Sequence, residues 1–187
     1  NFENFSAQKK IYNVFNTENH RIINNNILSL NICLRTCISK KRIREGKNKL
    51  TKVSYEKHFL KCIHSLVIAT NEAVKNDKNV SLTVFDDHSE ASSICKIELL
   101  LNKLKCNWRV ITTKVSGQGE SLYEQFDFCR DKNSLFYFCE DDYLHTRSAI
   151  NEMIDFYKNI YLETDSHLLI HPQEHELIYS QINYPSY

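Results

Sequence analysis

The sequence predicts an α/β fold, with a mainly parallel sheet and helices on both of its faces. Three observations support this fold class. Short apolar runs rich in β-branched and aromatic residues alternate with segments of helical periodicity from residue 27 to residue 171. Two of these runs end directly in acidic residues. The 187 residues, 42% of them hydrophobic, are enough for one domain with a substantial core.

The alternation assigns each element in turn. An N-terminal extension, 1–26, is polar and rich in Asn, and a basic insertion, about 39–53, separates the first strand from the first helix of the domain at 27–171. The expected strands are 27–34, 80–85, 108–113, 134–139 and 167–171, the last of which is stopped by Pro172. The expected helices are 54–74 with Ser54 as its cap, one opened by Ser89, 120–130 and 146–161.

The composition excludes several classes of protein. A net charge of +1 gives no general attraction for nucleic acid or an anionic membrane. No stretch approaches the roughly 20 apolar residues of a transmembrane helix, and the N-terminus lacks the pattern of a signal peptide. The seven cysteines are irregularly spaced, and those in apolar patterns are expected to be buried, reduced thiols. These are Cys62, Cys95, Cys129 and Cys139. We therefore expect a cytoplasmic protein with no transmembrane segment and no nucleic-acid partner.

Acidic residues follow two of the expected strands. Asp86-Asp87-His88-Ser89 comes after the strand at 80–85, and Glu140-Asp141-Asp142 comes after the strand at 134–139. Ligands of parallel α/β sheets bind beyond the carboxyl ends of the strands, so we expect both groups at one site. Adjacent carboxylates repel one another, and Mg²⁺ or Mn²⁺ would relieve that repulsion. Such ions in turn suit a diphosphate.

Each motif also has a structural interpretation that the sequence leaves open. The acids after 134–139 could form a solvated turn, and Ser89 or a neighbouring Asp could simply cap a helix. Gly117 and Gly119 could form a plain turn, or could let backbone N–H groups approach a ligand. The basic run 40–49 could be a solvated surface, or could close over a diphosphate.

The order of these motifs resembles the nucleotide-sugar-binding half of a GT-A glycosyltransferase, most closely family 2. The resemblance covers roughly 27–160, and Gly119-Glu120-Ser121 matches the start of a helix that the family places before its DXD motif. The DXD motif is matched by Glu140-Asp141-Asp142. His88 stands where the family commonly has Gly, Glu124 where it often has Arg, and Gln125 where it usually has Asn.

The resemblance implies roles for particular residues. Asp142 would bind Mn²⁺ or Mg²⁺, with Glu140 near the ribose or a metal-bound water, and His171 is a candidate additional metal ligand. Glu174 and Glu176 are the candidates for a catalytic base. The residues that would contact the nucleotide-sugar are Arg35, Thr36, Asp86, Asp87, Ser89, Gly117, Gly119, Ser121, Glu140 and Asp141.

The resemblance therefore implies a metal-dependent transferase. It would move a sugar from a nucleoside-diphosphate sugar, with UDP as the default nucleotide, to a hydroxyl of a glycan or other acceptor, with inversion. The tail at 172–187 is short for an acceptor region, so a partner domain or an oligomer could complete the site. The alternatives are a non-catalytic or incomplete nucleotide-sugar-binding domain and a sugar nucleotidyltransferase. The nucleotidyltransferase is disfavoured because no Gly-rich loop follows the first strand. A Rossmann cofactor domain is also disfavoured, because no Gly-x-Gly-x-x-Gly follows any strand.

Overall fold

The computed structural model describes residues 28–39, 53–170 and 172. The chain divides into two compact units, Asn1–Asn151 and Glu152–Tyr187. Strands and helices alternate along the described residues, as the sequence predicts. The elements are β1 (Ser29–Thr36), α4 (Tyr55–Lys75), β2 (Asn79–Asp86), α5 (Ala91–Leu101), β3 (Trp108–Thr112), α6 (Gln118–Cys129), β4 (Leu135–Glu140) and α7 (Ala149–Thr164).

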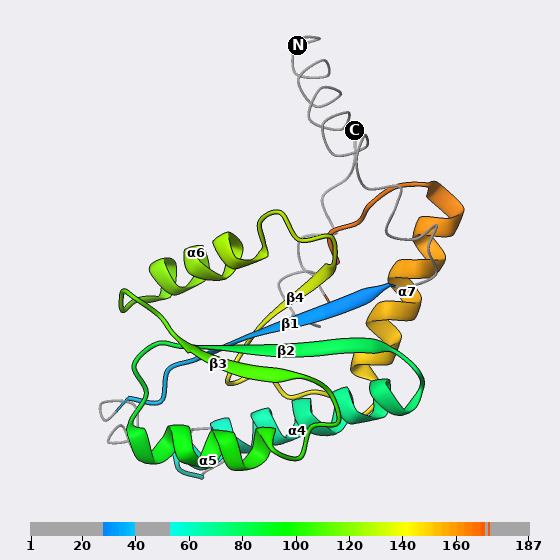
Figure 1. The fold of residues 1–187 in the computed structure, drawn as a ribbon. Coiled ribbons are helices and arrows are strands. Elements are labelled where there is room, and N and C mark those ends of the chain that lie inside the picture. The colour runs from blue at the N-terminus through cyan, green and yellow to red at the C-terminus, as the bar shows by residue number, and fades with distance from the viewer. Residues whose placement is uncertain (1–27, 40–52, 171, 173–187) are drawn as a thin grey trace, which may run out of the picture. The chain divides into compact units, whose positions relative to one another are not determined.

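The four strands form one parallel sheet in the order β3-β2-β1-β4 (Figure 1). The predicted α/β class with a parallel sheet is therefore confirmed, and the arrangement is Rossmann-like. β1 lies between β2 and β4, so the first strand of the chain becomes an inner strand of the sheet. This placement matters for the site, because the two acidic turns then follow the two strands on either side of β1.

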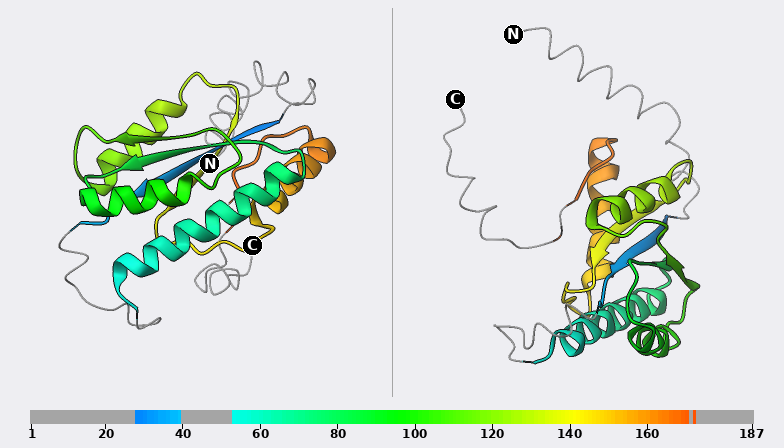
Figure 2. Two further views of the ribbon diagram at one scale, coloured as in Figure 1. Left: turned by 60° about the horizontal axis from the view of Figure 1, so that its bottom comes forward. Right: turned by 90° about the vertical axis from the view of Figure 1, so that its left-hand side faces the viewer.

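Helices cover both faces of the sheet, as predicted. α4 and α5 lie side by side on one face, and α6 lies on the opposite face (Figures 1 and 2). α4 packs through one apolar stripe that includes Phe59, Ile63 and Leu66, each at most 2% exposed. A stripe of this width is what an amphipathic helix buries against a sheet.

The core is centred on β1 and β2. Both strands are buried along most of their length, as expected for inner strands with helices on both faces. Helices contribute the remaining apolar side chains on each side. The largest fully buried apolar side chains are Phe85, Ile32, Leu34, Ile38, Ile63, Leu66, Leu82, Ile97, Leu101, Ile150 and Val67.

Ser54 caps α4 as the sequence predicts. Its backbone is extended, and its hydroxyl accepts a 3.3 Å hydrogen bond from the Lys57 N–H. Such a cap satisfies one of the N–H groups that the first helical turn leaves without a partner. The N-terminal boundary of this 21-residue helix is therefore determined by residues that are neighbours in the sequence.

The predicted fifth strand is wrong. Residues 166–170 follow α7 without forming a strand, and Leu169 is fully exposed. An apolar run satisfies the composition of a strand, but a strand also needs a neighbour to complete its backbone hydrogen bonds. Within this second unit, His167 instead contacts α7, where its Nδ1 lies 2.6 Å from the Tyr157 hydroxyl.

The cysteines lie within the described residues, and all seven are free thiols. Cys33, Cys62 and Cys139 are buried, whereas Cys95 is exposed on α5. The expectation of burial is thus confirmed for Cys62 and Cys139, whereas Cys129 is only partly buried. It is wrong for Cys95, because the buried stripe of α5 runs through Ser93, Ile97 and Leu101 instead. In the part of the chain that the structure describes, none of the helices has the length and apolar character needed to cross a membrane.

Candidate functional site

The carboxyl ends of three parallel strands bring the two acidic turns to one edge of the sheet. Asp86 at the end of β2 faces Thr36 at the end of β1, and Glu140 at the end of β4 faces Arg35. The predicted acids therefore lie on both sides of one strand end. At this edge of a parallel α/β sheet, ligands bind in the crevice beyond the strands.

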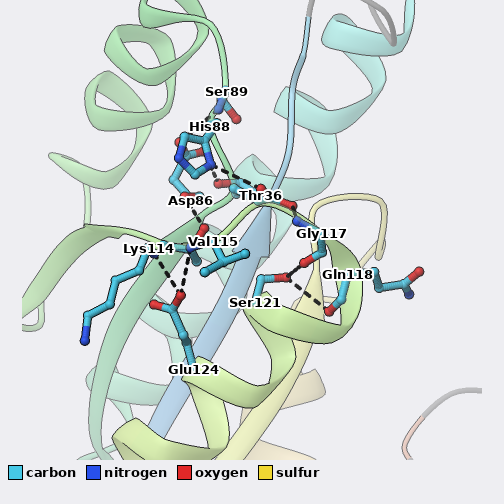
Figure 3. Close-up of polar contacts among 12 residues, drawn as sticks. Thr36, Asp86, His88, Ser89, Lys114, Val115, Gly117, Gln118, Ser121 and Glu124 are labelled. Atoms are coloured by element: carbon cyan, nitrogen blue, oxygen red, sulfur yellow. Dashed lines mark hydrogen bonds and ion pairs between the residues drawn. The ribbon is translucent and has the colours of Figure 1, made fainter.

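Asp86 is held by the chain on both carboxylate oxygens. The Thr36 hydroxyl donates a 2.8 Å hydrogen bond to Oδ1, and the Ser89 N–H donates a 3.0 Å bond to Oδ2 (Figure 3). The residue is 3% exposed, so these donors compensate for the water that its carboxylate loses. Asp86 thus organises the turn after β2, and its remaining acceptor capacity is what a ligand could use.

Asp87 occupies the next position and bridges two loops. Its N–H donates a 2.7 Å bond to the Thr36 carbonyl, and its Oδ2 accepts a 3.0 Å bond from the Gly117 N–H. Burial alone raises the pKa of Asp87, but hydrogen bonds from Gly117, Ser116 and His88 and the positive charge of Arg35 outweigh it and hold the pKa below its usual value. Asp87 is therefore ionised at neutral pH.

His88 adopts a left-handed backbone conformation with φ +56°, which residues other than glycine adopt less readily. Its side chain is half exposed, and its Nδ1 lies 3.3 Å from Asp87 Oδ1. The imidazole is therefore held by Asp87 on one side and remains half exposed to solvent.

Ser89 does not open the following helix, which corrects the prediction. α5 begins at Ala91, and its N-cap, Glu90, makes no capping hydrogen bond through its side chain. The Ser89 hydroxyl instead accepts a 2.7 Å bond from the Ile38 N–H. Because Asp86 takes the Ser89 N–H and His88 is left-handed, the turn after β2 extends for several residues before the helix starts.

Arg35 links β1 to α6 and β4. Its Nε donates a 2.8 Å hydrogen bond to the Ser121 hydroxyl, and its Nη1 lies 3.2 Å from Glu140 Oε1. The Ser121 hydroxyl in turn donates to the Gly117 carbonyl at 2.7 Å. Arg35 thereby fixes the first turn of α6 beside the acids of β4, through contacts that the resemblance alone does not specify.

Position 117 requires glycine for its backbone conformation, whereas position 119 does not. Gly117 has φ +133°, and a Cβ there would lie 2.5 Å from Glu120 Oε2. Its N–H is taken by Asp87, so this donor serves the protein itself. A Cβ on Gly119 would meet no atom within 4 Å, so Gly119 is not required for close packing. It lines a hollow of about 430 Å³ beside α6 and the loop before it, together with Tyr123 and Glu124.

The three acids at the end of β4, Glu140, Asp141 and Asp142, have different environments. Asp141 is 3% exposed and accepts a 2.8 Å bond from the Cys37 N–H. Glu140 is partly exposed and paired with Arg35, whereas Asp142 is exposed and makes no hydrogen bond or ion pair with a described residue. Asp142 is therefore the carboxylate of this turn that is open to a cation.

The carboxylates at this edge could supply only part of the ligand set that Mg²⁺ or Mn²⁺ requires. Among residues 28–39, 53–170 and 172, no three His, Cys, Asp or Glu side chains form a cluster that could hold a metal ion by themselves. Mg²⁺ commonly needs just one or two protein carboxylates, with phosphate oxygens and water as the other ligands. Asp142, with Glu140 nearby in sequence, fits a metal of this kind and does not fit a site built from protein ligands alone.

Several contributors to this edge were not identified from the sequence. Thr113 is 2% exposed and its N–H donates to the Asp86 carbonyl at 2.9 Å. Glu124 accepts bonds from the N–H groups of Lys114 and Val115, which holds the loop before α6 (Figure 3). The helical spacing of Glu124 three residues after Ser121 is the signal that could have placed it on this side of α6.

Other predicted residues lie outside the described part of the chain. These are the candidate bases Glu174 and Glu176, the candidate ligand His171, the basic run 40–49 and the N-terminal extension 1–26. Their roles stay predictions.

No family model matches the sequence, and neither a curated protein nor a solved structure is significantly similar to it. The family resemblance therefore depends on the order of the motifs and on the fold that now carries them.

Proposed function

We propose that this chain binds a nucleoside-diphosphate sugar at the carboxyl ends of β1, β2 and β4 and transfers the sugar to an acceptor hydroxyl, in the manner of a GT-A glycosyltransferase of family 2. One observation carries the proposal. Two acidic turns flank the end of β1, and Asp142, in the turn after β4, is left exposed without a partner among the described residues.

The proposed roles follow from the contacts at this edge. The turn containing Asp87 and His88 would contact the nucleoside, since an ionised carboxylate accepts hydrogen bonds from a base N–H or a ribose hydroxyl. Asp142 would hold Mn²⁺ or Mg²⁺ together with diphosphate oxygens, and the ion would neutralise the charge that develops on the departing diphosphate. Arg35 would position Glu140 and the start of α6.

In the proposed reaction, the acceptor oxygen forms a bond to the anomeric carbon as the bond from that carbon to the diphosphate oxygen breaks. The acceptor proton passes to a general base, for which Glu174 and Glu176 are the candidates. The nucleoside diphosphate leaves, and the configuration at the anomeric carbon is inverted.

A non-catalytic nucleotide-sugar-binding domain is the second candidate. This candidate is favoured because the buried carboxylates already accept hydrogen bonds within the protein. Both oxygens of Asp86 and one oxygen of Asp141 do so. The two candidates share donor binding and differ in turnover. Release of UDP from UDP-sugars, with and without a simple glycoside acceptor, separates them.

Thermal unfolding with UDP, GDP or CDP, each with Mn²⁺ or with EDTA, tests the shared part of the proposal. A ligand at about 100 times its Kd stabilises the native state by about 2.7 kcal/mol, which raises the melting temperature by several degrees. We expect a shift with one nucleotide that requires Mn²⁺ and is lost in Asp142→Asn. The matched control is Asp131→Asn, which changes an exposed acid after α6. Absence of a shift with all three nucleotides would overturn the proposal.

A further inference from the structure

A basic groove runs between α4 and α5. It has a volume of about 460 Å³ and lies apart from the carboxylate-rich edge. Figure 2 shows the two helices next to each other, with α4 running at an angle to the shorter α5. The groove is lined by Lys57, Leu60, Lys61, His64, Lys96, Leu99, Leu100 and Lys103.

The charge of the basic groove is of one sign. Four of its eight lining residues are lysines, and none is acidic. Lys96 is neutralised by Glu56 at 2.7 Å. Lys57, Lys61 and Lys103 form no ion pair with any residue in the described ranges. Positive charge is thus concentrated here, although the whole chain is nearly neutral.

Leucines lie between these lysines. Leu99 is 66% exposed, and Leu60 and Leu100 are partly exposed. Ile68, 43% exposed, continues the same stripe of α4 one turn beyond His64. Large exposed apolar side chains that are gathered together and rimmed by charge mark an interaction surface.

Hydrogen bonds between α4 and either α5 or the residues just after it frame the groove at both ends. At one end Glu56 accepts hydrogen bonds from Lys96 and Ser93, at 2.7 and 2.9 Å. At the other end Asn71 donates to the Lys103 carbonyl and accepts from the Lys105 N–H, both at 2.8 Å. From residue 57 to residue 71, α4 extends about 20 Å, which is about four helical turns.

We propose that the basic groove binds an amphipathic helix of a partner protein, with leucine-like side chains on one face and acidic side chains flanking them. The leucines match the apolar face of such a helix, and the lysines at positions 57, 61 and 103 match its acids. The hollow is open rather than deep, and the apolar face of a helix lying along it would cover the exposed leucines. The leucines distinguish the groove from a site for a simple polyanion.

Binding to synthetic probes tests this proposal. The first probe is a helical peptide of about 14 residues with leucines at i, i+3, i+4 and i+7 and glutamates beside them. The second is a peptide of the same composition in scrambled order, and the third is phosphatidylcholine vesicles containing phosphatidylserine. Fluorescence anisotropy measures the two peptides, and co-sedimentation measures the vesicles.

We expect the amphipathic peptide to bind at least about tenfold more tightly than the scrambled one. The double variant Lys61→Glu/Lys103→Glu should lose about tenfold or more in affinity, because like charges then face the peptide. Leu99→Ser should also weaken binding. The matched control Lys75→Glu/Lys158→Glu reverses two exposed lysines outside the groove and should bind like wild type. Unchanged melting temperatures of all variants establish that they are folded.

Three outcomes would overturn the proposal. They are equal affinity for the two peptides, unchanged affinity in the Lys61→Glu/Lys103→Glu variant, and vesicle binding that this variant abolishes while the peptide fails to bind. The last outcome would make the groove a lipid surface. None of these outcomes depends on the proposed transferase activity, because the groove shares no residue with the acidic turns.

Discussion

The Thr36 hydroxyl donates a 2.8 Å hydrogen bond to the Asp86 carboxylate, and the two residues face each other at the ends of β1 and β2. Thr36 is completely buried and Asp86 is 3% exposed. The bond therefore joins two inner strands of the sheet at the point where the candidate site begins. It also sets the orientation of a carboxylate that the turn after β2 is built around.

Thr36→Val keeps the shape of the side chain and removes this donor. We expect the free energy of unfolding to fall by about 1–3 kcal/mol, because Asp86 Oδ1 then lacks its partner in a buried position. The control Thr112→Val changes an exposed threonine at the end of β3 and should have little effect. Urea unfolding of the three proteins measures the difference, and equal midpoints for Thr36→Val and wild type would contradict the assignment.

Gly117 and Gly119 should respond to alanine in opposite directions. Gly117→Ala forces an alanine into φ +133°, a conformation that costs about 1–3 kcal/mol for residues other than glycine. Gly119 lies in the first turn of α6 with open space around it, so Gly119→Ala should stabilise the protein by up to about 1 kcal/mol. Denaturant midpoints for the two variants test the pair. A stabilising Gly117→Ala would contradict the described loop before α6.

The sequence predicted the fold because the relevant signals are local. Alternation of strand and helix, and the Ser54 cap, each depend on residues that are neighbours in the chain. The position of the acids followed from one general rule about parallel sheets, once their strands had been located. The strand order β3-β2-β1-β4 does not follow from such local signals, because it depends on which strands pair, and the paired strands are far apart in the sequence.

The wrong sequence predictions also result from contacts between residues that are far apart in the sequence. Ser89 has the composition of a helix cap, but Ile38, 51 residues away in sequence, donates to its hydroxyl instead. Residues 167–170 have the composition of a strand, but they form no ladder with another described residue. The contacts of Arg35 with Ser121 and Glu140 also span long separations, so residue types alone could not have predicted them.

Asp87 should contribute to the acid sensitivity of the protein. Its pKa is lower in the folded protein than the usual value near 3.9, so the unfolded chain binds more protons at low pH. The contribution to stability is full above the unfolded pKa and is lost as the pH falls through the folded pKa. We therefore expect Asp87→Asn to be less stable than wild type at neutral pH, with a difference that shrinks as the pH falls below about 5.

Urea unfolding at a series of pH values measures that difference. Asp131→Asn is the control, because Asp131 is exposed and its φ of +61° is one that asparagine tolerates. Its stability curve should run parallel to that of wild type. A constant gap between Asp87→Asn and wild type across the whole series would show that the Asp87 carboxylate is not held as described.

Cysteine labelling should distinguish the exposed thiol of Cys95 on α5 from the buried thiol of Cys62 on α4. Cys95 is exposed on α5, whereas Cys62 is buried on α4 and burial, aided by Asp142 and Asp141, raises its pKa to about 11. Iodoacetamide reacts with the thiolate, so we expect Cys95 to be alkylated much faster than Cys62 or Cys139 in the native protein. Peptide mass spectrometry over time measures the order. Cys95→Ser should remove the fast phase, and urea should expose all seven thiols. Equally fast alkylation of Cys62 and Cys95 in the native state would contradict the packing of α4 against the sheet, because that packing is what excludes reagent from Cys62.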